Sequence, residues 1–382
     1  MKIATNCVHA GHEPDEATGA VNVPIYATST YAYRRFGEHR GWEYSRTGNP
    51  TRSALERAMA ELEGGADGIA FASGLAAIDA ITDLLEPGDH VVAGDNLYGG
   101  TYRLFTTITE RHGIEVSFVD AADTQAFENA CSDRTRVVFA ETPTNPMMRL
   151  ADLSAVAAVA HERGALMVVD NTFLTPVLQR PIDLGADLVV HSTTKYLNGH
   201  SDGVGGVIVA RDADLGERLH TVQNNVGAIL GPFDAYLVLR GLKTLAVRMA
   251  VHESNGRNLA GFLLARKDVE AVHYPGLANH PQHQLARTQQ TGFGGMISVD
   301  LGSLERARAF CDGVEIFTLA ESLGGVESLV CHPASMTHAA VPVSERERLG
   351  IGDGLIRLSV GIEDAGDLEA DITKGLEAAA TV

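Results

Sequence analysis

The sequence is poor in cysteine and shows no metal-binding spacing. Its 382 residues include four cysteines, at positions 7, 131, 311 and 331, and none of them forms a CxxC pair. This scatter argues against a disulfide framework and against a zinc site. The 15 histidines include no HExxH pattern, so we expect no bound metal.

Positive charge is also scarce. There are 30 lysines and arginines against 49 aspartates and glutamates, and the formal net charge is −19. Nucleic acid is bound by basic surfaces, so this balance argues against nucleic acid as a partner. Only five of the basic residues are lysines: Lys2, Lys195, Lys243, Lys267 and Lys374. Lys195 is the unusual one, because it comes after an apolar run instead of lying among other charges.

Long apolar runs and nucleotide-binding loops are missing too. No segment reaches the roughly 20 apolar residues of a membrane-spanning helix, so we expect no membrane association. The first residues, MKIATNCVHAGHEPDE, lack the apolar core of a secretory signal, and a cytoplasmic location is expected. No strand is followed by GxGxxG or by a Walker-type loop, which argues against a nicotinamide dehydrogenase.

Short apolar runs recur through the middle of the chain, separated by helical stretches. The runs are GIAFAS, HVVAGD, EVSFVD, RVVFAET, ALMVVDN, DLVVHS and GGVIVA. Because most of them lack a polar face, they predict strands of a mostly parallel sheet with helices on both faces, an α/β fold.

The ends of the chain have a different texture. From about residue 250, segments such as MISVDLG and LIRLSVGIE alternate more and predict a smaller α+β domain. The first 50 residues are irregular and rich in Gly, Pro, Thr and Tyr, which suggests an extended arm. We therefore expect an arm at 1–50, a cofactor-binding domain at 51–248 and a C-terminal domain at 249–382.

The residues just after three of the strands point to one kind of chemistry. The SGL segment at 73–75 opens a helix, which is either an anion site or an ordinary helix cap. Asp170 ends another strand, as a cap or as the partner of a positive group. Ser192, Thr194 and Lys195 come at the end of a third strand, and there the lysine is either a nucleophile or half of a salt bridge. Together these ends fit pyridoxal phosphate, which needs an anion site, an acid and a lysine.

The chain resembles the Cys/Met-metabolism enzymes that use pyridoxal phosphate, almost from end to end. The segments that carry the resemblance are YSRTGNPT (44–51), FASGLAA (71–77), LYGGTY (97–102), ETPTNP (141–146), VVDNTF (168–173), HSTTKYLNGHSD (191–202), GPFDAYLVLRGLKTL (231–245), LAESLGGVESL (319–329) and IRLSVGIED (356–364). The resemblance implies fold type I of the pyridoxal-phosphate-dependent transferases, which is aminotransferase-like, and pyridoxal 5′-phosphate as the cofactor.

The resemblance also implies roles for single residues around the cofactor. Lys195 would be the Schiff-base lysine and proton shuttle, Asp170 the partner of the ring nitrogen, and Tyr98 the residue that stacks on the ring. The residues implied to bind the phosphate within the same chain are Gly74, Leu75, Ser192 and Thr194. Those implied to reach the phosphate of a neighbouring subunit are Tyr44 and Arg46. The active unit would then be a homodimer at least, and the family commonly forms tetramers of two such dimers.

The substrate side is implied in the same way. Arg357 and Asn145 would bind the α-carboxylate, with Ser322 beside them. Arg357 fits from its neighbours alone, because an arginine among apolar residues is costly to bury without a carboxylate partner. Glu43 and Glu321 would lie at the outer pocket, where two carboxylates suit the distal ammonium of cystathionine, although an acidic rim in solvent is the alternative.

The resemblance implies a carbon–sulfur lyase acting on a small amino acid. The expected reaction is γ-elimination on cystathionine, giving cysteine, 2-oxobutyrate and ammonia. Cystathionine γ-synthase, which joins an O-acyl-homoserine to cysteine, stays open as the alternative. Gly100 stands where methionine γ-lyases carry cysteine, which disfavours that activity. The two acidic outer positions differ from the bulky residues of bacterial β-lyases, which disfavours β-lyase activity as well. A non-catalytic homologue is disfavoured because Lys195, Asp170 and Arg357 are all present.

Overall fold

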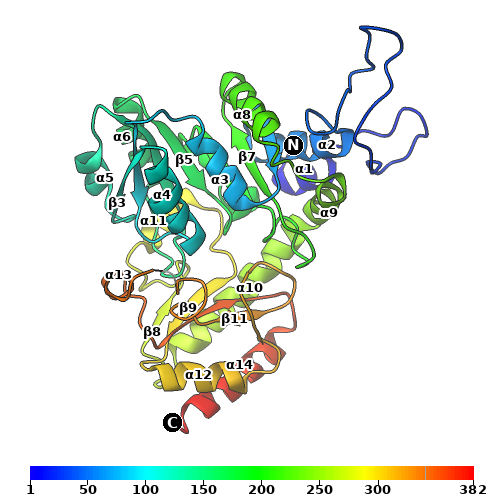
Figure 1. The fold of residues 1–382 in the computed structure, drawn as a ribbon. Helices are drawn as coiled ribbons and strands as arrows, with labels where there is room; N and C mark the ends of the chain where they lie inside the picture. Colours follow the sequence, from blue (N-terminus) through cyan, green and yellow to red (C-terminus); the bar gives the residue numbers. More distant parts are fainter. Residues whose placement is uncertain (340) are drawn as a thin grey trace.

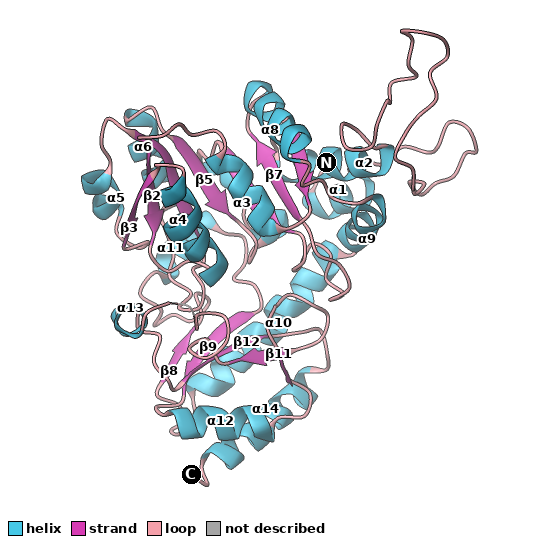
Figure 2. Cartoon of the chain, viewed as in Figure 1, coloured by secondary structure: helices cyan, strands magenta, loops and turns pink. Residues whose placement is uncertain are grey.

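The computed structural model describes residues 1–339 and 341–382 and contains two β-sheets, one above the other in Figure 1. The larger sheet has seven strands and the smaller has five. Helices pack around both sheets, and the segment between α1 and α2 projects away from them (Figure 2). Within the described residues, no helix is long and apolar enough to cross a membrane.

The seven apolar runs form the larger sheet, in the order β1-β7-β6-β5-β4-β2-β3. The strands are β1 (Asp67–Phe71), β2 (His90–Gly94), β3 (Glu115–Val119), β4 (Thr135–Glu141), β5 (Leu166–Asp170), β6 (Leu188–Ser192) and β7 (Gly206–Ala210). Strands β2 to β6 run parallel, whereas β7 is antiparallel to both β1 and β6. The mostly parallel α/β sheet predicted from the sequence is therefore confirmed.

Helices cover both faces of this sheet, which is why its strands have no polar face. The helices on one face are α3 (Gly74–Thr82), α4 (Gly99–Arg111) and α8 (Ala213–Val226). Those on the other face are α1 (Ile3–His9), α2 (Pro50–Glu63), α5 (Thr124–Ala130), α6 (Leu153–Glu162), α7 (Thr175–Leu178), α9 (Pro232–Leu242) and the start of α10 (Leu245–Leu264). A short 3₁₀ turn, η1 (Pro181–Leu184), precedes β6.

The smaller sheet has the order β10-β11-β12-β9-β8 and its own apolar core. Its strands are β8 (Ala271–His273), β9 (Met296–Asp300), β10 (Thr318–Leu319), β11 (Leu329–Cys331) and β12 (Leu355–Ser359). The helices that follow α10 along the chain are α11 (His283–Gln289), α12 (Leu304–Gly313), α13 (Val343–Arg348) and α14 (Ala365–Ala379), and α11 lies beside the larger sheet (Figure 1). The predicted segments MISVDLG and LIRLSVGIE supply β9 and β12. The strands β8 and β11 are too short for their alternation to be noticed in the sequence.

The first 50 residues begin with a packed helix, which differs from the irregular arm that the sequence suggested. Helix α1 lies against α2 and α10 and buries Cys7. Residues 11–49, all of which the structure describes, form only isolated bridges, and much of the segment projects from the body of the molecule although Val23 is buried in the core (Figure 1). Phe36, in this projection, is fully exposed. The expected domain limits stay a prediction, and the limit at 248 falls inside α10, which packs into both cores.

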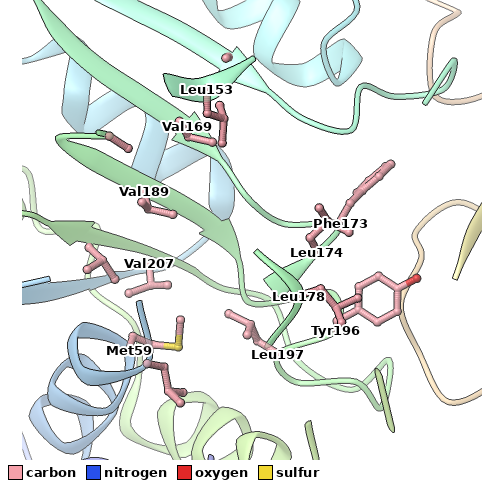
Figure 3. Close-up of a cluster of buried hydrophobic side chains, with 14 of the residues drawn as sticks. Met59, Leu153, Val169, Phe173, Leu174, Leu178, Val189, Tyr196, Leu197 and Val207 are labelled. Carbon is pink, nitrogen blue, oxygen red and sulfur yellow. The ribbon is translucent and has the colours of Figure 1, made fainter. Parts of the chain in front are cut away.

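Apolar side chains anchor the loops after β5 and β6. Phe173-Leu174 comes just after β5 and Tyr196-Leu197 just after β6, and all four side chains are buried. Figure 3 shows them in one cluster with Val169, Val189 and Met59. Because each loop enters the core within a few residues of its strand, the backbone at Asp170 and Lys195 is held rigidly.

A buried polar network joins α2 to the same two strand ends. Glu63 Oε1 lies 2.6 Å from His191 Nε2, and neither side chain is exposed. Asn171 Nδ2 donates to Glu63 Oε1 at 2.9 Å and to the carbonyl oxygen of Gln179 at 2.8 Å. Removing one member of such a network leaves the others buried without a partner, which is strongly destabilising.

Glu63→Ala is therefore expected to lower the free energy of unfolding by about 3 kcal/mol, because His191 and Asn171 lose their shared acceptor. The measurement is urea denaturation followed by circular dichroism. Glu61→Ala, at an exposed position on the same helix, is the matched control and should change the value by less than about 0.5 kcal/mol. Equal unfolding midpoints for the two variants would show that the network does not stabilise the fold.

Candidate active site

A cavity of about 320 Å³ opens at the carboxyl ends of β4, β5 and β6 and takes its other wall from the smaller sheet. Ligands of parallel α/β sheets bind beyond this end of the strands. Eleven of the predicted site residues line the cavity: Gly74, Leu75, Tyr98, Asn145, Asp170, Ser192, Thr194, Lys195, Glu321, Ser322 and Arg357. The fold thus gathers residues that are up to 283 positions apart, from Gly74 to Arg357.

The first turn of α3 meets hydroxyl groups from the loop after β6. Ser73 caps the helix, with its Oγ accepting from the backbone nitrogen of Ala76 at 3.0 Å. A Cβ on Gly74 would lie 3.0 Å from the Cβ of Ser192, and a Cβ on Gly206 would lie 2.2 Å from the carbonyl oxygen of Ser73. These glycines therefore let the helix end approach the Ser192 hydroxyl closely. A helix N-terminus beside hydroxyl groups is a binding site for a phosphate.

Asp170 ends β5 and lines the cavity. Its Oδ1 accepts from the backbone nitrogen of Thr172 at 2.9 Å, and Thr172 Oγ1 in turn accepts from the backbone nitrogen of Ser192 at 2.9 Å. Burial raises the pKa of Asp170, while the hydrogen bonds from Thr172 act in the opposite direction. A protonated nitrogen inside the cavity would favour the charged carboxylate.

Lys195 lines the cavity, and its Nζ donates to Ser322 Oγ at 2.8 Å. Burial, and next the positive charge of Arg357, lowers the pKa of Lys195 to about 8. The uncharged fraction of the side chain near neutral pH is then far larger than in an ordinary lysine. An uncharged amine is both a nucleophile and a base, which explains why a lysine stands directly after a buried strand.

Arg357, on β12, is 2% exposed and has no carboxylate partner among the described residues. Its Nη1 donates to Asn145 Oδ1 at 2.9 Å and its Nη2 to the carbonyl oxygen of Ser322 at 2.8 Å. Its Nε is buried and finds no hydrogen-bond partner among the residues that the structure describes. Ser322 has a φ of +91°, an unfavourable conformation for a residue with a side chain. In this conformation its hydroxyl accepts from Lys195 and its carbonyl oxygen accepts from Arg357. A buried guanidinium in this state is a receptor for a ligand carboxylate.

Two features near Tyr98 were not foreseen. The backbone nitrogen of Tyr98 donates to Glu141 Oε2 at 2.9 Å, and Glu141 lines the cavity as a second acid beside Asp170. A Cβ on Gly100 would lie 2.4 Å from the ring of Tyr98, so the absence of a side chain at this position leaves room for the ring. Glu141 ends β4 as Asp170 ends β5, and that shared position after an apolar run is the sequence signal that could have identified it. Besides Glu141 and the helix cap Ser73, the lining residues without a predicted role are Ile78, Thr101, Thr172, Phe173, Val204, Leu323 and Thr337.

The three predicted site residues of the arm lie apart from the cavity. Of the residues that the structure describes, none of Glu43, Tyr44 and Arg46 is among those that line it. Arg46 Nη1 donates to Asn224 Oδ1 at 3.1 Å, and its guanidinium lies 5.6 Å from the centre of the Tyr44 ring. Glu43 accepts from the hydroxyl of Tyr33 at 2.7 Å. Within one chain these residues are thus not part of the site.

The residues of the cavity fit pyridoxal 5′-phosphate. The end of α3 with the hydroxyls of Ser192 and Thr194 suits the phosphate, and the amine of Lys195 suits the aldehyde. Asp170 suits the ring nitrogen, because burial raises the pKa of its carboxyl group and a cation placed beside it would favour the charged form. The buried Arg357 Nε, which has no partner within residues 1–339 and 341–382, leaves a donor for an amino-acid carboxylate.

Comparison with known proteins points to one family. The family described as "Cys/Met metabolism PLP-dependent enzyme" matches residues 4–377. Cystathionine gamma-lyase of Bacillus subtilis is 54% identical over 99% of this chain and 100% of its own length. Cystathionine beta-lyase of Coxiella burnetii is 52% identical over 98% of this chain and 97% of its own. The crystal structure of cystathionine gamma synthase from Xanthomonas oryzae in complex with cystathionine is 49% identical, with a TM-score of 0.98 over 100% of this chain and 99% of that one.

In the chain freed of cofactor, Lys195 is expected to react with an amine-directed reagent with a midpoint near pH 8, because burial and Arg357 lower its pKa to about 8. Reactivity should rise as the pH passes through that value, since the uncharged amine is the reactive form. Arg357→Met should move the midpoint upward, because a positive neighbour is removed. Mass spectrometry of labelled peptides across a pH series gives both midpoints.

Lys374 is the internal reference for this experiment. It is exposed and paired with Glu315, which raises its pKa above the ordinary value. Its midpoint should lie well above that of Lys195 in the same sample. A Lys195 midpoint equal to that of Lys374 would contradict the electrostatic description of the cavity.

Proposed function

We propose, because the chain belongs to the Cys/Met metabolism PLP-dependent enzyme family, that it is a cystathionine γ-lyase. The overall reaction takes up one water, breaks the Cγ–S bond of cystathionine and releases cysteine, 2-oxobutyrate and ammonia. As a member of the family, it is an enzyme that uses pyridoxal 5′-phosphate, and its fold is fold type I. When bound, the cofactor supplies a protonated ring that stores the electron pair left at Cα.

The residues proposed to hold the cofactor all line the cavity. Asp170 would face the ring nitrogen, and Tyr98 would cover the ring. Lys195 would hold the aldehyde between turnovers. The set proposed for the phosphate is Gly74, Leu75, Ser192 and Thr194. The approach of α3 to the loop after β6 supports this set, because it places a helix end beside two hydroxyl-bearing residues.

The residues proposed to act on the substrate are linked by hydrogen bonds. Arg357 and Asn145 would bind the α-carboxylate, and so orient the Cα–H bond. The amine of Lys195, whose uncharged form burial favours and which Ser322 holds in place, would take the Cα proton and later return protons to the product. Tyr98 stands across the same cavity as a second group able to handle a proton.

One observation carries the choice of substrate. The amine of Lys195 and the unpaired guanidinium of Arg357 share their cavity with a further carboxylate, Glu321. An amino acid with a second ammonium group at its far end offers a carboxylate to Arg357 and a cation to Glu321, and cystathionine has this form. Glu43, on the arm, is the second carboxylate proposed for that ammonium, contributed by a neighbouring subunit. The 54% identity to the Bacillus subtilis cystathionine gamma-lyase supports the same substrate.

Cystathionine γ-synthase is the second candidate. The Xanthomonas oryzae enzyme with this activity is 49% identical, and its structure holds cystathionine, the same molecule that we propose as substrate here. A β-lyase also stands among the relatives, at 52% identity. Gly100 beside the ring of Tyr98 leaves no thiol at the position where methionine γ-lyases carry cysteine, which disfavours that activity. A cytoplasmic location stays a prediction from the sequence.

The projecting arm supports a homo-oligomer in which each arm completes a neighbour's site. Residues 30–48 carry four arginines against two glutamates, and Tyr33, Phe36 and Tyr44 are exposed there. A second groove adjoins the cavity and is lined by carboxylates: Asp202, Asp234, Glu321 and Glu327. We propose that a cationic arm docks near this acidic groove of another copy, bringing Tyr44 and Arg46 to its phosphate site. The proposed assembly is a tetramer of two such dimers.

Purified enzyme is expected to turn over cystathionine alone, releasing cysteine and 2-oxobutyrate, faster than it makes cystathionine from an O-acyl-homoserine and cysteine. The holoenzyme should also show the visible absorbance of its cofactor, and Lys195→Ala should lose that band together with more than about 1,000-fold in rate, because the base and the attachment point are one amine. Accumulation of cystathionine in the second assay, with little turnover in the first, would identify a γ-synthase.

Mixing inactive variants tests the arm. Lys195→Ala and Arg46→Ala chains, each inactive alone, should together recover roughly a quarter of wild-type activity, since half of randomly paired dimers then contain one intact site. Coexpression followed by the cystathionine assay is the measurement. If Arg46 served its own chain, the hybrid would be as inactive as its parents.

A further inference from the structure

Glu141 is a buried acid in the catalytic cavity for which the proposed reaction has no use. It is 5% exposed and ends β4. In the register of the sheet it lies directly beside Asp170, the last residue of β5. Residues paired in neighbouring parallel strands point their side chains to the same face, so the two carboxyl groups enter the cavity together.

Glu141 holds the backbone of Tyr98 in place through a hydrogen bond. The backbone nitrogen of Tyr98 donates to Glu141 Oε2 at 2.9 Å, across 43 positions of sequence. Tyr98 also directly precedes α4, and its carbonyl oxygen accepts from the backbone nitrogen of Tyr102 in the first turn of that helix. Tyr98 is 42% exposed, so packing alone does not hold its side chain. The direction of the ring over the cavity therefore depends on where the backbone of Tyr98 is fixed.

The surroundings of Glu141 decide whether its carboxyl group is protonated while it accepts from Tyr98. Burial, and next the carboxylate of Asp170, raise the pKa of Glu141 well above its ordinary value. The hydrogen bond from Tyr98 and the charge of Arg357 act against this rise, but they are the smaller effects. Lys195 is the other charged group that lines this part of the cavity. Two neighbouring buried carboxyl groups do not both ionise, and Asp170 has the additional support of Thr172.

We propose that Glu141 is a positioning residue that stays protonated, anchors the backbone of Tyr98 and leaves Asp170 as the single anion beside the cofactor ring. The neutral acid accepts from Tyr98 without adding a second negative charge near the ring nitrogen. The proposal rests on cofactor binding by the family and is independent of the choice between γ-lyase and γ-synthase. It also explains why an acid that ends a strand next to Asp170 does not compete with it for the ring nitrogen.

Two substitutions separate the effect of the acceptor oxygen of Glu141 from the effect of its negative charge. Glu141→Gln keeps the size and the acceptor oxygen but cannot ionise, and Glu141→Leu keeps the bulk but accepts nothing. The full chain is freed of cofactor and titrated with pyridoxal 5′-phosphate, with visible circular dichroism as the readout, because it reports how the ring is held. Glu141→Gln should bind within about threefold of wild type with an unchanged signal. Glu141→Leu should bind at least about tenfold more weakly with a reduced signal, the loss expected for one hydrogen bond.

A matched control comes from Glu56, another buried acid that accepts from a backbone nitrogen. It accepts from Ala70 at 3.1 Å, but it is paired with Arg52, whose Nε lies 3.4 Å away. Glu56→Gln should therefore lower the melting temperature, because it unpairs a buried charge, and leave the cofactor signal unchanged. Glu141→Gln should leave both the melting temperature and the cofactor signal unchanged.

Either of two results would overturn the proposal. If Glu141→Gln weakened cofactor binding as much as Glu141→Leu, the negative charge of Glu141 would be what matters. If Glu141→Leu bound the cofactor with wild-type affinity and an unchanged signal, the anchor would have no effect on the ring. Both readouts are independent of the substrate, so a failure of the cystathionine assay would leave them interpretable.

Discussion

The site depends on one loop residue, Ser322, that joins the two sheets. Its hydroxyl accepts from Lys195 Nζ at 2.8 Å, and its carbonyl oxygen accepts from Arg357 Nη2 at the same distance. Lys195 comes just after a strand of the larger sheet, whereas Arg357 lies in the smaller one. Ser322 therefore sets the distance between the amine of Lys195 and the guanidinium of Arg357, and its unfavourable φ of +91° is tolerated because both bonds hold it there.

The surrounding frame is apolar and covered on both faces, and this sets the electrostatics of the cavity. Water is kept from the strand ends, so burial is the largest influence on the pKa values of Lys195, Asp170 and Glu141. Each of these groups, with Arg357, would be more stable if it were paired inside the chain. These groups instead stay free to contact a cofactor and a substrate. The lower stability of the folded chain is the usual cost of a preformed polar site.

Much of the frame was predictable because buried parallel strands are continuous apolar runs, and all seven runs form strands of one sheet. Helix α1 was missed because its packing against α2 and α10 comes from tertiary contacts that a short polar segment does not announce. Glu141 was missed although it ends its strand as Asp170 does, because a single acid after an apolar run does not indicate what its carboxyl group touches. The arm was predicted as extended, and its residues 43 to 46 reach no cavity in their own chain.

By itself the sequence determined the order of strands and helices, the kind of cofactor and the reactive residue types, since these depend on apolar patterning and on side-chain chemistry after each strand. Only the tertiary structure decided which ionisable groups lie beside one another and which are left without a partner of opposite charge. The guanidinium of Arg357 without an acid, the serine between Lys195 and Arg357, and the neighbouring carboxyl groups of Glu141 and Asp170 all depend on distances between distant segments. Electrostatic energies change steeply over a few ångströms in a buried cavity, and those distances exist only once the chain has folded.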